Sequence, residues 1–398
     1  MKRILFVDDD SNILDGIRRM LRADRNRWEI QFAIGGEAAL RACEAGSFDV
    51  VFSDMRMPGM DGATFLGHIR DRFPATSRCI LSGYSEIELT IRALPVAHRV
   101  LSKPCKGAEL QATIERICTL QDVLCTPELR PVMGSIGELP SLPSTLRALT
   151  QAVQAPNAQV KTIAKLIAQD IAITAKVLQI VNSGFFGLGQ RITNLECAVQ
   201  FLGMETIKTL ALDSEAFKEF GAESRVPQSV YETMQEHAQR TAAIAATLSI
   251  GSDDRDIAIV SALLHDIGSL ALVCKVPDQF STILTCARDR GCKPVEAEEE
   301  LLGITHAEIG AYLLGLWGID HRVVEAIAHH HRPDRIPHTG VDGCVALYVA
   351  DLLAFEIEHH PLDVEGIQLD ESDRACLKTL GILHEFSGFR ERALQCLR

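Results

Sequence analysis

The stretch Ser261-Ala-Leu-Leu-His-Asp-Ile-Gly-Ser-Leu270 places a histidine next to an aspartate inside an otherwise apolar segment. Burying such a pair costs free energy unless both side chains have partners. Imidazole nitrogen and carboxylate oxygen are also ligands for borderline divalent ions such as Zn²⁺. The stretch is therefore either part of a metal site that acts on a phosphate ester or a hydrogen-bonded pair in an ordinary core.

Further histidines and one aspartate fall on separate predicted helices in the second half of the chain. The complete set is His237, His265, Asp266, His306, His330, His331 and Asp351. Such side chains on facing helices can hold one or two divalent ions in a bundle core. Two ions would clamp a phosphate and generate hydroxide from a bridging water. In the alternative, 329–331 is only a polar helix end whose imidazolium suits the helix dipole. Both alternatives stay open from the sequence.

A second group of polar residues falls at the predicted carboxyl ends of strands near the N-terminus. These residues are Asp8, Asp9, Asp54, Ser82 and Lys103. Converging carboxylates repel one another unless a hard cation such as Mg²⁺ neutralises them. With a lysine and a hydroxyl beside the metal, the pattern predicts attack by an aspartate carboxylate on a phosphoryl donor, giving an acyl phosphate. The alternative, in which residues 8–10 only cap a helix and Lys103 is solvated, is disfavoured because all five residues fall at strand ends.

The first 120 residues must position this second group, and in them short apolar runs alternate with amphipathic stretches. The predicted strands are Ile4–Val7, Glu29–Ala33, Val50–Ser53, Arg78–Ser82 and Arg99–Ser102. The predicted helices are Ser11–Ala23 (capped by Ser11 or Asn12), Gly36–Ala45, Gly62–Phe73, Glu86–Leu94 and Lys106–Leu124. This alternation predicts a five-stranded parallel sheet with helices on both faces. Such sheets gather functional groups at the carboxyl ends of their strands.

Four motifs in this segment closely resemble the receiver domain of two-component response regulators, which has a flavodoxin-like α/β fold. They are VDDD at 7–10, SDMRMPGMDG at 53–62, LSGYS at 81–85 and SKPC at 102–105. The resemblance implies that Asp54 is the phosphoacceptor and that a sensor histidine kinase is the partner. The implied Mg²⁺ ligands are Asp8, Asp9, Asp54 and the backbone carbonyl of Arg56. The implied phosphoryl contacts are Ser82 and Lys103, with Pro104 next in the family's usual strained peptide.

One position departs from the receiver pattern. Receiver domains commonly carry Tyr or Phe three residues before the lysine as a rotameric switch, and here that residue is Val100. The departure leaves phosphorylation of Asp54 as expected. Transmission of the signal by an aromatic flip is not expected.

From Leu142 onward, apolar residues recur at intervals of three and four, which predicts an all-helical half without strands. The prolines and glycines of 125–141 mark the domain boundary. The expected helices that carry the histidines and aspartates are Met234–Leu248, Ile257–Val273, 306–317 and Val345–Phe355. A further helix over 168–183 ends at Asn182, which is either a helix cap or a site residue.

Six segments of this half, in order, resemble the HDOD domain, a helical output module related to the HD-superfamily phosphohydrolases. They are LPSLPSTL, QDIAITAKVLQIVNSGFFG, AVQFLG, ALLHDIGSL, THAEIGAYLLGLWGI and AIAHHHRP, within 138–333. HDOD domains are generally regarded as signalling or interaction modules, because many have lost metal-site residues. This sequence keeps every residue type of the HD set. The resemblance therefore implies a non-enzymatic output, or alternatively a phosphohydrolase with an Mn, Fe, Zn or Ni type of ion.

Two features separate this half from its enzymatic relatives. Cyclic-di-GMP phosphodiesterases of the superfamily follow their paired histidines with Glu and a Gly-Tyr-Pro loop, which the segment 330–340 lacks. Nothing therefore predicts a cyclic-dinucleotide substrate. In addition, the insert Lys275–Ile304, with its acidic run Glu298–Glu300, separates His265 from His306 and could displace His306 from the His-Asp pair.

The composition predicts a soluble cytoplasmic protein. The chain has 398 residues, enough for two or three domains, and a net charge of −13, which argues against nucleic-acid binding. Its 12 cysteines are scattered without a CxxC motif, as in a reducing compartment. No stretch is expected to approach the ~20 apolar residues of a membrane span, and no helix-turn-helix signature indicates direct DNA binding.

The predicted organisation is a receiver domain over 1–120, a linker over 121–137, an HDOD domain over 138–335 and a C-terminal helical extension over 336–398. The predicted function is that of a response regulator, phosphorylated on Asp54, whose output domain contacts an unknown downstream signalling protein. A homodimer through the receiver domain is a further expectation. The alternative is a phosphorylation-regulated, metal-dependent phosphohydrolase that uses the HD-type site.

Overall fold

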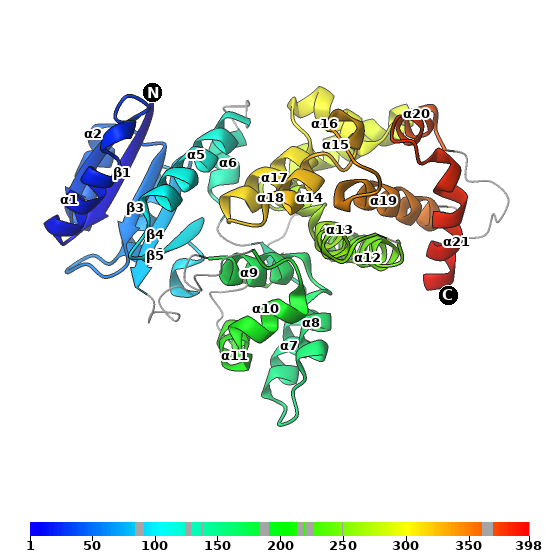
Figure 1. The fold of residues 1–398 in the computed structure, drawn as a ribbon, viewed down its shortest axis with the longest axis horizontal. Helices are drawn as coiled ribbons and strands as arrows, with labels where there is room; N and C mark the ends of the chain where they lie inside the picture. The colour runs from blue at the N-terminus through cyan, green and yellow to red at the C-terminus, as the bar shows by residue number, and fades with distance from the viewer. Residues whose placement is uncertain are drawn as a thin grey trace.

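The chain folds into an α/β part and a larger helical part, which lie side by side (Figure 1). The computed structural model describes residues 1–83, 91–123, 129–136, 139–183, 191–212, 218–219, 227–248, 250–359 and 369–397. The predicted fold class, a five-stranded parallel sheet with helices followed by a mainly helical domain, is confirmed.

The sheet of the N-terminal part has the strand order β2-β1-β3-β4-β5, and all four pairings are parallel. Its strands are β1 Lys2–Asp8, β2 Trp28–Ile34, β3 Val50–Asp54, β4 Ser77–Gly83 and β5 Arg99–Lys103. The central strands are apolar on both faces because helices cover both. The order places the carboxyl ends of β1 and β3 beside each other, so Asp8 and Asp54 end neighbouring strands.

Helices α1 Ser11–Met20, α2 Gly36–Ala45, α3 Gly62–Arg72 and α5 Gly107–Val123 cover the sheet. The prediction that Ser11 or Asn12 caps the first helix was wrong. Asp10 is the N-cap, and its carboxylate accepts the backbone N–H of Asn12 at 2.8 Å. A carboxylate one residue earlier reaches the free N–H groups of the first turn. Most of the helix expected over 86–94, and Tyr84-Ser85 of the LSGYS motif, lie outside the described residues.

The second part is built almost entirely of helices. They are α6 Leu129–Gly134, α7 Pro143–Gln154, α8 Val160–Ile167, α9 Ile171–Val181, α10 Leu195–Leu202, α11 Met204–Leu212, α12 Gln228–Ala245, α13 Ser252–Leu264, α14 Ile267–Lys275, α15 Pro277–Arg290, α16 Pro294–Leu302, α17 His306–Leu316, α18 His321–Ala328, α19 Gly343–His359, α20 Glu371–Thr379 and α21 Phe386–Cys396.

Two expectations for this half were wrong in detail. Strands β6 Pro140–Ser141 and β7 Lys218–Glu219 form a short parallel pair, which is too short to leave a periodic pattern in the sequence. The single helix expected over 257–273 is two helices, α13 and α14, which meet at His265-Asp266. The break changes the chain direction at the pair that carries the candidate chemistry.

The stretch Ser252–Lys275, which contains α13 and α14, is long and apolar enough to cross a membrane by length and composition. The expectation that no stretch approaches this length was therefore wrong. However, 83% of its most apolar window is buried inside the protein. In this fold α13 packs against α12 and α19, and α14 packs against α17, so the apolar stretch forms the core of the helical part.

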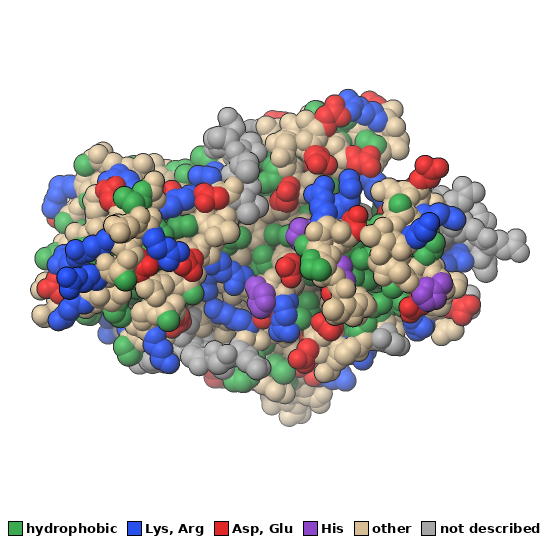
Figure 2. All heavy atoms as spheres, turned by 45° about the horizontal axis from the view of Figure 1, so that its top comes forward, with side chains coloured by type: hydrophobic (Ala, Val, Ile, Leu, Met, Phe, Trp, Pro, Cys, Tyr) green, Lys and Arg blue, Asp and Glu red, His purple; other side chains and the backbone are tan. Residues whose placement is uncertain are grey.

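The two parts meet along α5, which packs on α17. A Cβ on Gly315 of α17 would lie 2.7 Å from the Leu120 side chain of α5, so the two helices are in close contact. Arg116 of α5 donates from Nη2 to the carbonyl of Ile319 at 3.0 Å. Gln179 of α9 donates to the carbonyl of His98 at 3.1 Å. Figure 2 shows Lys and Arg side chains on one face where the two parts meet.

Candidate phosphoacceptor site and candidate metal centre

The carboxyl ends of β1, β3 and β5 bring two carboxylates and one ammonium group together. Lys103 Nζ donates to Asp8 Oδ2 at 2.6 Å and also to Asp54 Oδ1. Asp8 is buried and Asp54 is 9% exposed. Burial raises the pKa of Asp54, while the hydrogen bonds from Lys103 oppose that rise. Burial alone would lower the pKa of Lys103, but its bonds to Asp54 and Asp8 raise it.

The remaining predicted residues of this site lie at the same edge of the sheet. Asp9 is exposed directly after β1, and Ser82 is buried near the end of β4. The backbone N–H of Arg56 donates to Asp54 Oδ2 at 2.7 Å, which places that residue's backbone beside the carboxylate. These oxygen donors fit Mg²⁺, which prefers carboxylate and carbonyl oxygen.

Two further positions of this site have a defined structure. Val100, at the position of the usual aromatic switch, is buried in the core on one side of the sheet. The peptide bond between Lys103 and Pro104 is cis. A buried Val cannot rotate between inward and outward positions as a surface aromatic ring does, which is consistent with transmission by another route.

In the helical part, five segments bring all seven predicted residues into one cluster. His237 lies on α12, His265-Asp266 lies between α13 and α14, and His306 opens α17. The pair 330–331 follows α18, and Asp351 lies on α19. Ring centroids of successive histidines are 3.9–5.3 Å apart. The packing of these helices therefore brings the side chains that the sequence singled out into contact with one another.

Asp351 lies at one side of the cluster. Its Oδ1 is 2.9 Å from His237 Nε2 and 3.6 Å from His265 Nε2. Its Oδ2 is 4.0 Å from His331 Nδ1. One carboxylate thus faces imidazoles from three different segments, as a ligand shared between them would.

Asp266 lies between two further imidazoles. Its Oδ2 is 3.3 Å from His265 Nε2, and its Oδ1 is 3.5 Å from His306 Nε2. His306 Nε2 is in turn 2.9 Å from His331 Nε2. The adjacent His-Asp pair is therefore part of a larger contact network and is not an isolated core pair.

The ligand atoms form three overlapping groups, within each of which all atoms lie within 4.8 Å of one another. The groups are His306, His330 and His331; His237, His265 and Asp351; and His265, Asp266 and His330. Nitrogen and carboxylate oxygen in such groups suit Zn-like or Mn-like divalent ions. His265 and His330 each belong to two of the groups, so ions in neighbouring groups would share ligands.

Backbone carbonyls fix the orientation of two of these rings. His265 Nδ1 donates to the Ala262 carbonyl at 2.8 Å, and His330 Nδ1 donates to the Ile327 carbonyl at 2.7 Å. With Nδ1 as the donor, Nε2 is the bare nitrogen that a metal needs. The Nε2 atom of His330 is buried and has no hydrogen-bond partner among the described residues. A buried acceptor without a partner is costly, and a metal ion at this point would remove that cost.

Two glutamates that sequence reasoning did not assign support the outer sides of the rings. The buried Glu298 carboxylate accepts from His306 Nδ1 at 2.7 Å and from its backbone N–H at 2.8 Å. Glu358 lies 3.1 Å from His237 Nδ1. Carboxylates at the far nitrogen of ligand histidines are typical of metal sites. The acidic run around Glu298 was the available signal, but it was interpreted as part of a displacing insert.

The expectation that the insert could displace His306 was therefore wrong. The insert folds into α15 and α16, and α16 carries Glu298 against the first residue of α17. The capping box formed by Thr305 and Glu308 fixes the start of α17. The insert thus holds His306 within the cluster because its helix supplies the carboxylate that orients the ring.

Burial and nearby carboxylates shift the pKa values of the clustered histidines in opposite directions. Burial would lower the pKa of His306, but Glu298 raises it to about 9. Burial also opposes protonation of His237, yet its bonds to Asp351 and Glu358 raise its pKa to about 11. Burial lowers the pKa of His330 to about 3. Because metal ligands bind in their deprotonated form, a divalent ion would compete with protons for the nitrogens of His237 and His306.

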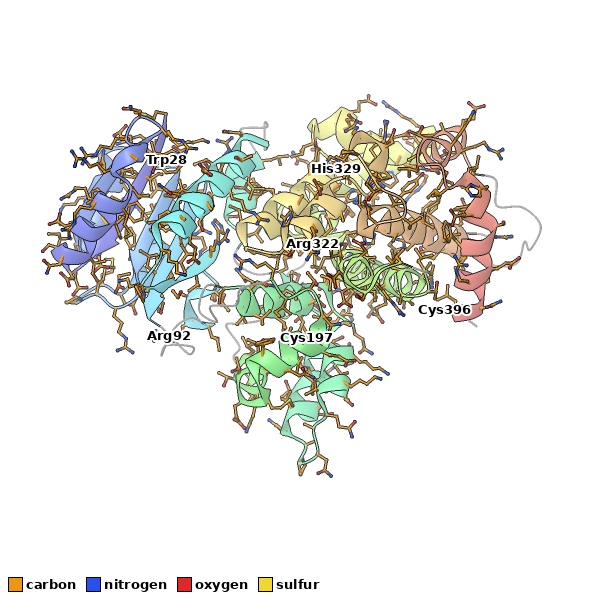
Figure 3. All side chains as sticks on the ribbon, in the orientation of Figure 1. Trp28, Arg92, Cys197, Arg322, His329 and Cys396 are labelled. Atoms are coloured by element: carbon orange, nitrogen blue, oxygen red, sulfur yellow. The ribbon has the colours of Figure 1, made fainter. Side chains whose placement is uncertain are left out.

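Two other polar residues of the helical part lie outside the donor groups. Asn182 caps α9, and its side chain exchanges hydrogen bonds with the backbone of Ile192 at 2.7 and 2.9 Å. Its role in the structure is therefore that of a cap. His329 is the C-cap of α18, at the opposite end of that helix from Arg322 (Figure 3). Of the three consecutive histidines, only the second and third belong to the donor groups.

Comparison with protein families supports the two-part organisation. The family model for the response regulator receiver domain matches residues 4–115, and the model for the HDOD domain matches residues 139–333. The chain is a response regulator with an HDOD output domain. The receiver domain implies a cognate histidine kinase and typically binds Mg²⁺.

Two relatives each match only part of this receiver–HDOD protein. An uncharacterized protein of Treponema pallidum (strain Nichols) is 26% identical over 240 residues, which is 58% of this chain and 45% of that protein. The hydrogenase transcriptional regulatory protein HoxA of Bradyrhizobium diazoefficiens is 32% identical over 119 residues, 29% of this chain and 24% of HoxA. The matches thus span less than half the length of either relative.

Among solved structures, the MmoQ response regulator from Methylococcus capsulatus str. Bath is 23% identical, with a TM-score of 0.47. That match covers 60% of this chain and 93% of MmoQ. The signal receiver domain of an HD domain-containing protein from Pseudomonas fluorescens Pf-5 is 29% identical, with a TM-score of 0.29, and covers 30% of the receiver–HDOD chain and 97% of its own.

Proposed function

We propose that a sensor histidine kinase phosphorylates Asp54 and that this event controls the HDOD domain as a signalling and protein-interaction output. The observation that carries the proposal is the packing of α5 on α17. Helix α5 follows Lys103, which contacts the phosphoacceptor, and α17 begins at His306 of the histidine cluster. A change at Asp54 thus has a physical route along α5 to the output domain.

The proposed roles in the receiver domain follow from the contacts of Asp54. When bound, Mg²⁺ would neutralise the phosphoryl oxygens, and its proposed ligands are Asp8, Asp9, Asp54 and the Arg56 carbonyl. Phosphorylation would end the direct contact of Lys103 with the Asp54 carboxylate, and Lys103 and Ser82 would contact the phosphoryl group. Because α5 begins four residues after Lys103, movement of this lysine acts on the helix that touches the output domain.

We propose the domain boundaries 1–120, 121–137, 138–335 and 336–398 for receiver, linker, HDOD domain and C-terminal extension, in a cytoplasmic protein. A downstream signalling protein is the proposed target. Any receiver homodimer would have to leave the α5–α17 contact in place or replace it. Asp351 of α19 contributes to the histidine cluster, so the extension is proposed to be part of the output domain's site and not an appendage.

A second candidate function is supported by the donor groups of the cluster. All seven residues of the HD-type set are in contact, and the buried His330 Nε2 lacks a partner in the described structure. We propose that the cluster binds one or two divalent metal ions. A bound pair of ions could generate hydroxide for hydrolysis of a phosphate ester. A metal-dependent phosphohydrolase is the alternative to a purely non-enzymatic output.

The first test is phosphorylation of the full-length protein with a small-molecule phosphodonor and Mg²⁺. Wild type should incorporate phosphate and change its protection of the α5 and α17 amides from hydrogen exchange. Asp54→Ala should show neither effect. The nearby exposed Asp9→Asn variant should retain the acceptor but require more Mg²⁺. Incorporation without any change at α5 or α17 would contradict the proposed route.

The second test distinguishes a non-enzymatic output domain from a metal-dependent phosphohydrolase. The metal-loaded protein is assayed with a generic phosphodiester, next to His265→Ala and Asp266→Ala. Turnover that both substitutions abolish supports the phosphohydrolase. Metal binding without turnover supports the non-enzymatic output with a structural metal.

A further inference from the structure

Three arginines at the junction of the two domains have no role in either site described above. Arg99 begins β5, Arg116 lies on α5, and Arg191 precedes α10 in the HDOD domain. We call them the interdomain arginine cluster. Arg99 is 6% exposed, whereas Arg116 and Arg191 are partly exposed. The cluster therefore combines side chains from both domains, and two of its three arginines reach solvent.

The cluster surrounds the turn between α17 and α18. A Cβ on Gly318 of that turn would lie 3.4 Å from the guanidinium carbon of Arg99. Arg116 donates to the carbonyl of the next residue, Ile319, at 3.0 Å. The two receiver arginines therefore meet the HDOD domain at adjacent residues, Arg99 at Gly318 and Arg116 at Ile319.

The third arginine reaches the same junction through α9. Arg191 donates from Nη1 to the carbonyl of Asn182, the cap of that helix. One helical turn earlier, Gln179 donates to the carbonyl of His98, which directly precedes Arg99. The end of α9 thus links the positions of Arg191 and Arg99.

These three positive charges have no carboxylate in direct contact in the described parts of the chain, and Glu109 and Asp320 act on them only from a greater distance. Within the described parts of the chain, none of the three forms an ion pair within 4.0 Å, and Arg99 Nη1 is buried without a hydrogen-bond partner. Asp320, at the turn, is engaged by Arg322, whose backbone N–H and Nε donate to its Oδ1 at 2.9 and 3.2 Å. Burial, followed by the charges of Arg191 and Arg116, lowers the pKa of Arg99 to about 10.

We propose that the interdomain arginine cluster binds a phosphate-bearing oxyanion between the receiver and HDOD domains. Buried or half-buried positive charges without counter-ions are costly, and a dianion at this point would offset that cost. Guanidinium groups match phosphate oxygens with paired N–H donors. Because both domains contribute arginines, the anion would favour the arrangement in which α5 packs on α17.

The experiment uses full-length protein in EDTA, because the phosphoacceptor site and the histidine cluster would hold phosphate through divalent ions. Isothermal titration calorimetry and thermal unfolding are measured with sodium phosphate, and with sodium chloride at equal ionic strength as the salt control. Pyrophosphate and ATP form two further arms. The variants are Arg191→Gln and Arg116→Gln, and the matched control is Arg41→Gln, an exposed arginine on α2.

Phosphate is expected to raise the unfolding temperature more than chloride does, and each cluster variant should weaken its affinity roughly tenfold or more. Arg41→Gln should behave as wild type. Tighter binding of ATP than of pyrophosphate would identify a nucleotide-type ligand, and tighter binding of pyrophosphate than of phosphate would identify a polyphosphate. Equal or weaker binding of both would identify free phosphate. If Arg116→Gln does not fold, Arg191→Gln decides the question. Equal responses to phosphate and chloride, or the same affinity in Arg191→Gln as in wild type, would overturn the proposal.

Discussion

Replacing Gly268 by alanine is expected to disrupt the candidate metal centre without removing any of its ligands. Gly268 follows His265-Asp266 in α14, where that helix crosses the start of α17. A Cβ at this position would lie 1.9 Å from the backbone oxygen of His306 and 2.8 Å from the backbone nitrogen of Gly310. The obstructing atoms belong to the main chain and cannot rotate away.

The size of the effect follows from that distance. Ordinary contact begins at 3.4 Å, so the two helices must separate by about 1.5 Å at this point (3.4 minus 1.9 Å). Overpacking a core costs about 1–3 kcal/mol and occasionally more, and a main-chain clash belongs at the upper end. For a domain of this size, about 3 kcal/mol corresponds to a fall in the unfolding temperature of about 6–12 °C.

The assay compares metal-free Gly268→Ala with wild type by thermal unfolding, and then compares divalent-metal affinity by calorimetry. Gly388→Ala on α21 is the matched control, because a Cβ there would meet only the tip of Arg392 at 3.9 Å. The control should be stabilised by up to about 1 kcal/mol, since alanine favours a helix over glycine. A Gly268→Ala protein with wild-type stability and metal affinity would refute the proposed contact between α14 and the backbone of His306.

Three more predictions concern separate parts of the molecule. Glu298→Gln should weaken the affinity for divalent metal about 10- to 100-fold, because His306 loses the carboxylate that orients its ring. Glu299→Gln, at an exposed position, should leave the affinity unchanged. Equal affinities of the two variants in calorimetry would contradict the role of Glu298. Burial raises the pKa of Asp170 to about 6, above its unfolded value of about 3.9, so this group stabilises the fold at low pH and loses that contribution as pH rises through 6. Between pH 4.5 and 6.5, the free energy of unfolding measured with urea should therefore fall by about 2 kcal/mol more in wild type than in Asp170→Asn. Parallel pH curves for the two proteins would contradict this role of Asp170. Gly315→Val should push against the Leu120 side chain and weaken the packing of α5 on α17. The two domains would then separate, and small-angle X-ray scattering should give a larger radius of gyration. An unchanged radius would contradict the α5–α17 contact.

Much of the receiver domain could be predicted because its signals are local. Each strand is a short apolar run, and the functional residues sit at strand ends, where the topology of parallel sheets collects them. Asp8, Asp54 and Lys103 therefore meet as expected. The helix cap at Asp10 was missed because three consecutive aspartates offered two roles, and the sequence does not distinguish a capping carboxylate from a site carboxylate.

The sequence allowed the members of the histidine cluster to be predicted, but not the contacts between them. The residue types and helical positions of the cluster are visible in the sequence, whereas the contacts join residues far apart in the chain, such as His237 and Asp351, which are 114 positions apart. Glu298 was misinterpreted because an acidic run usually marks a solvated face, and only the packing of α16 against α17 shows that one of its carboxylates is buried. The break between α13 and α14 was missed because both helices are apolar, so periodicity does not mark the junction.

The central claim, that the HDOD domain holds divalent metal through this cluster, is tested most directly by measuring the metal content of purified full-length protein. Inductively coupled plasma mass spectrometry should find one to two Mn, Fe, Zn or Ni ions per chain in wild type. The double variant His265→Ala, Asp266→Ala should lose them, while His384→Ala, an exposed histidine of the C-terminal region, should keep them. Wild-type protein without bound metal after reconstitution with these ions, or equal metal in the double variant, would contradict the account.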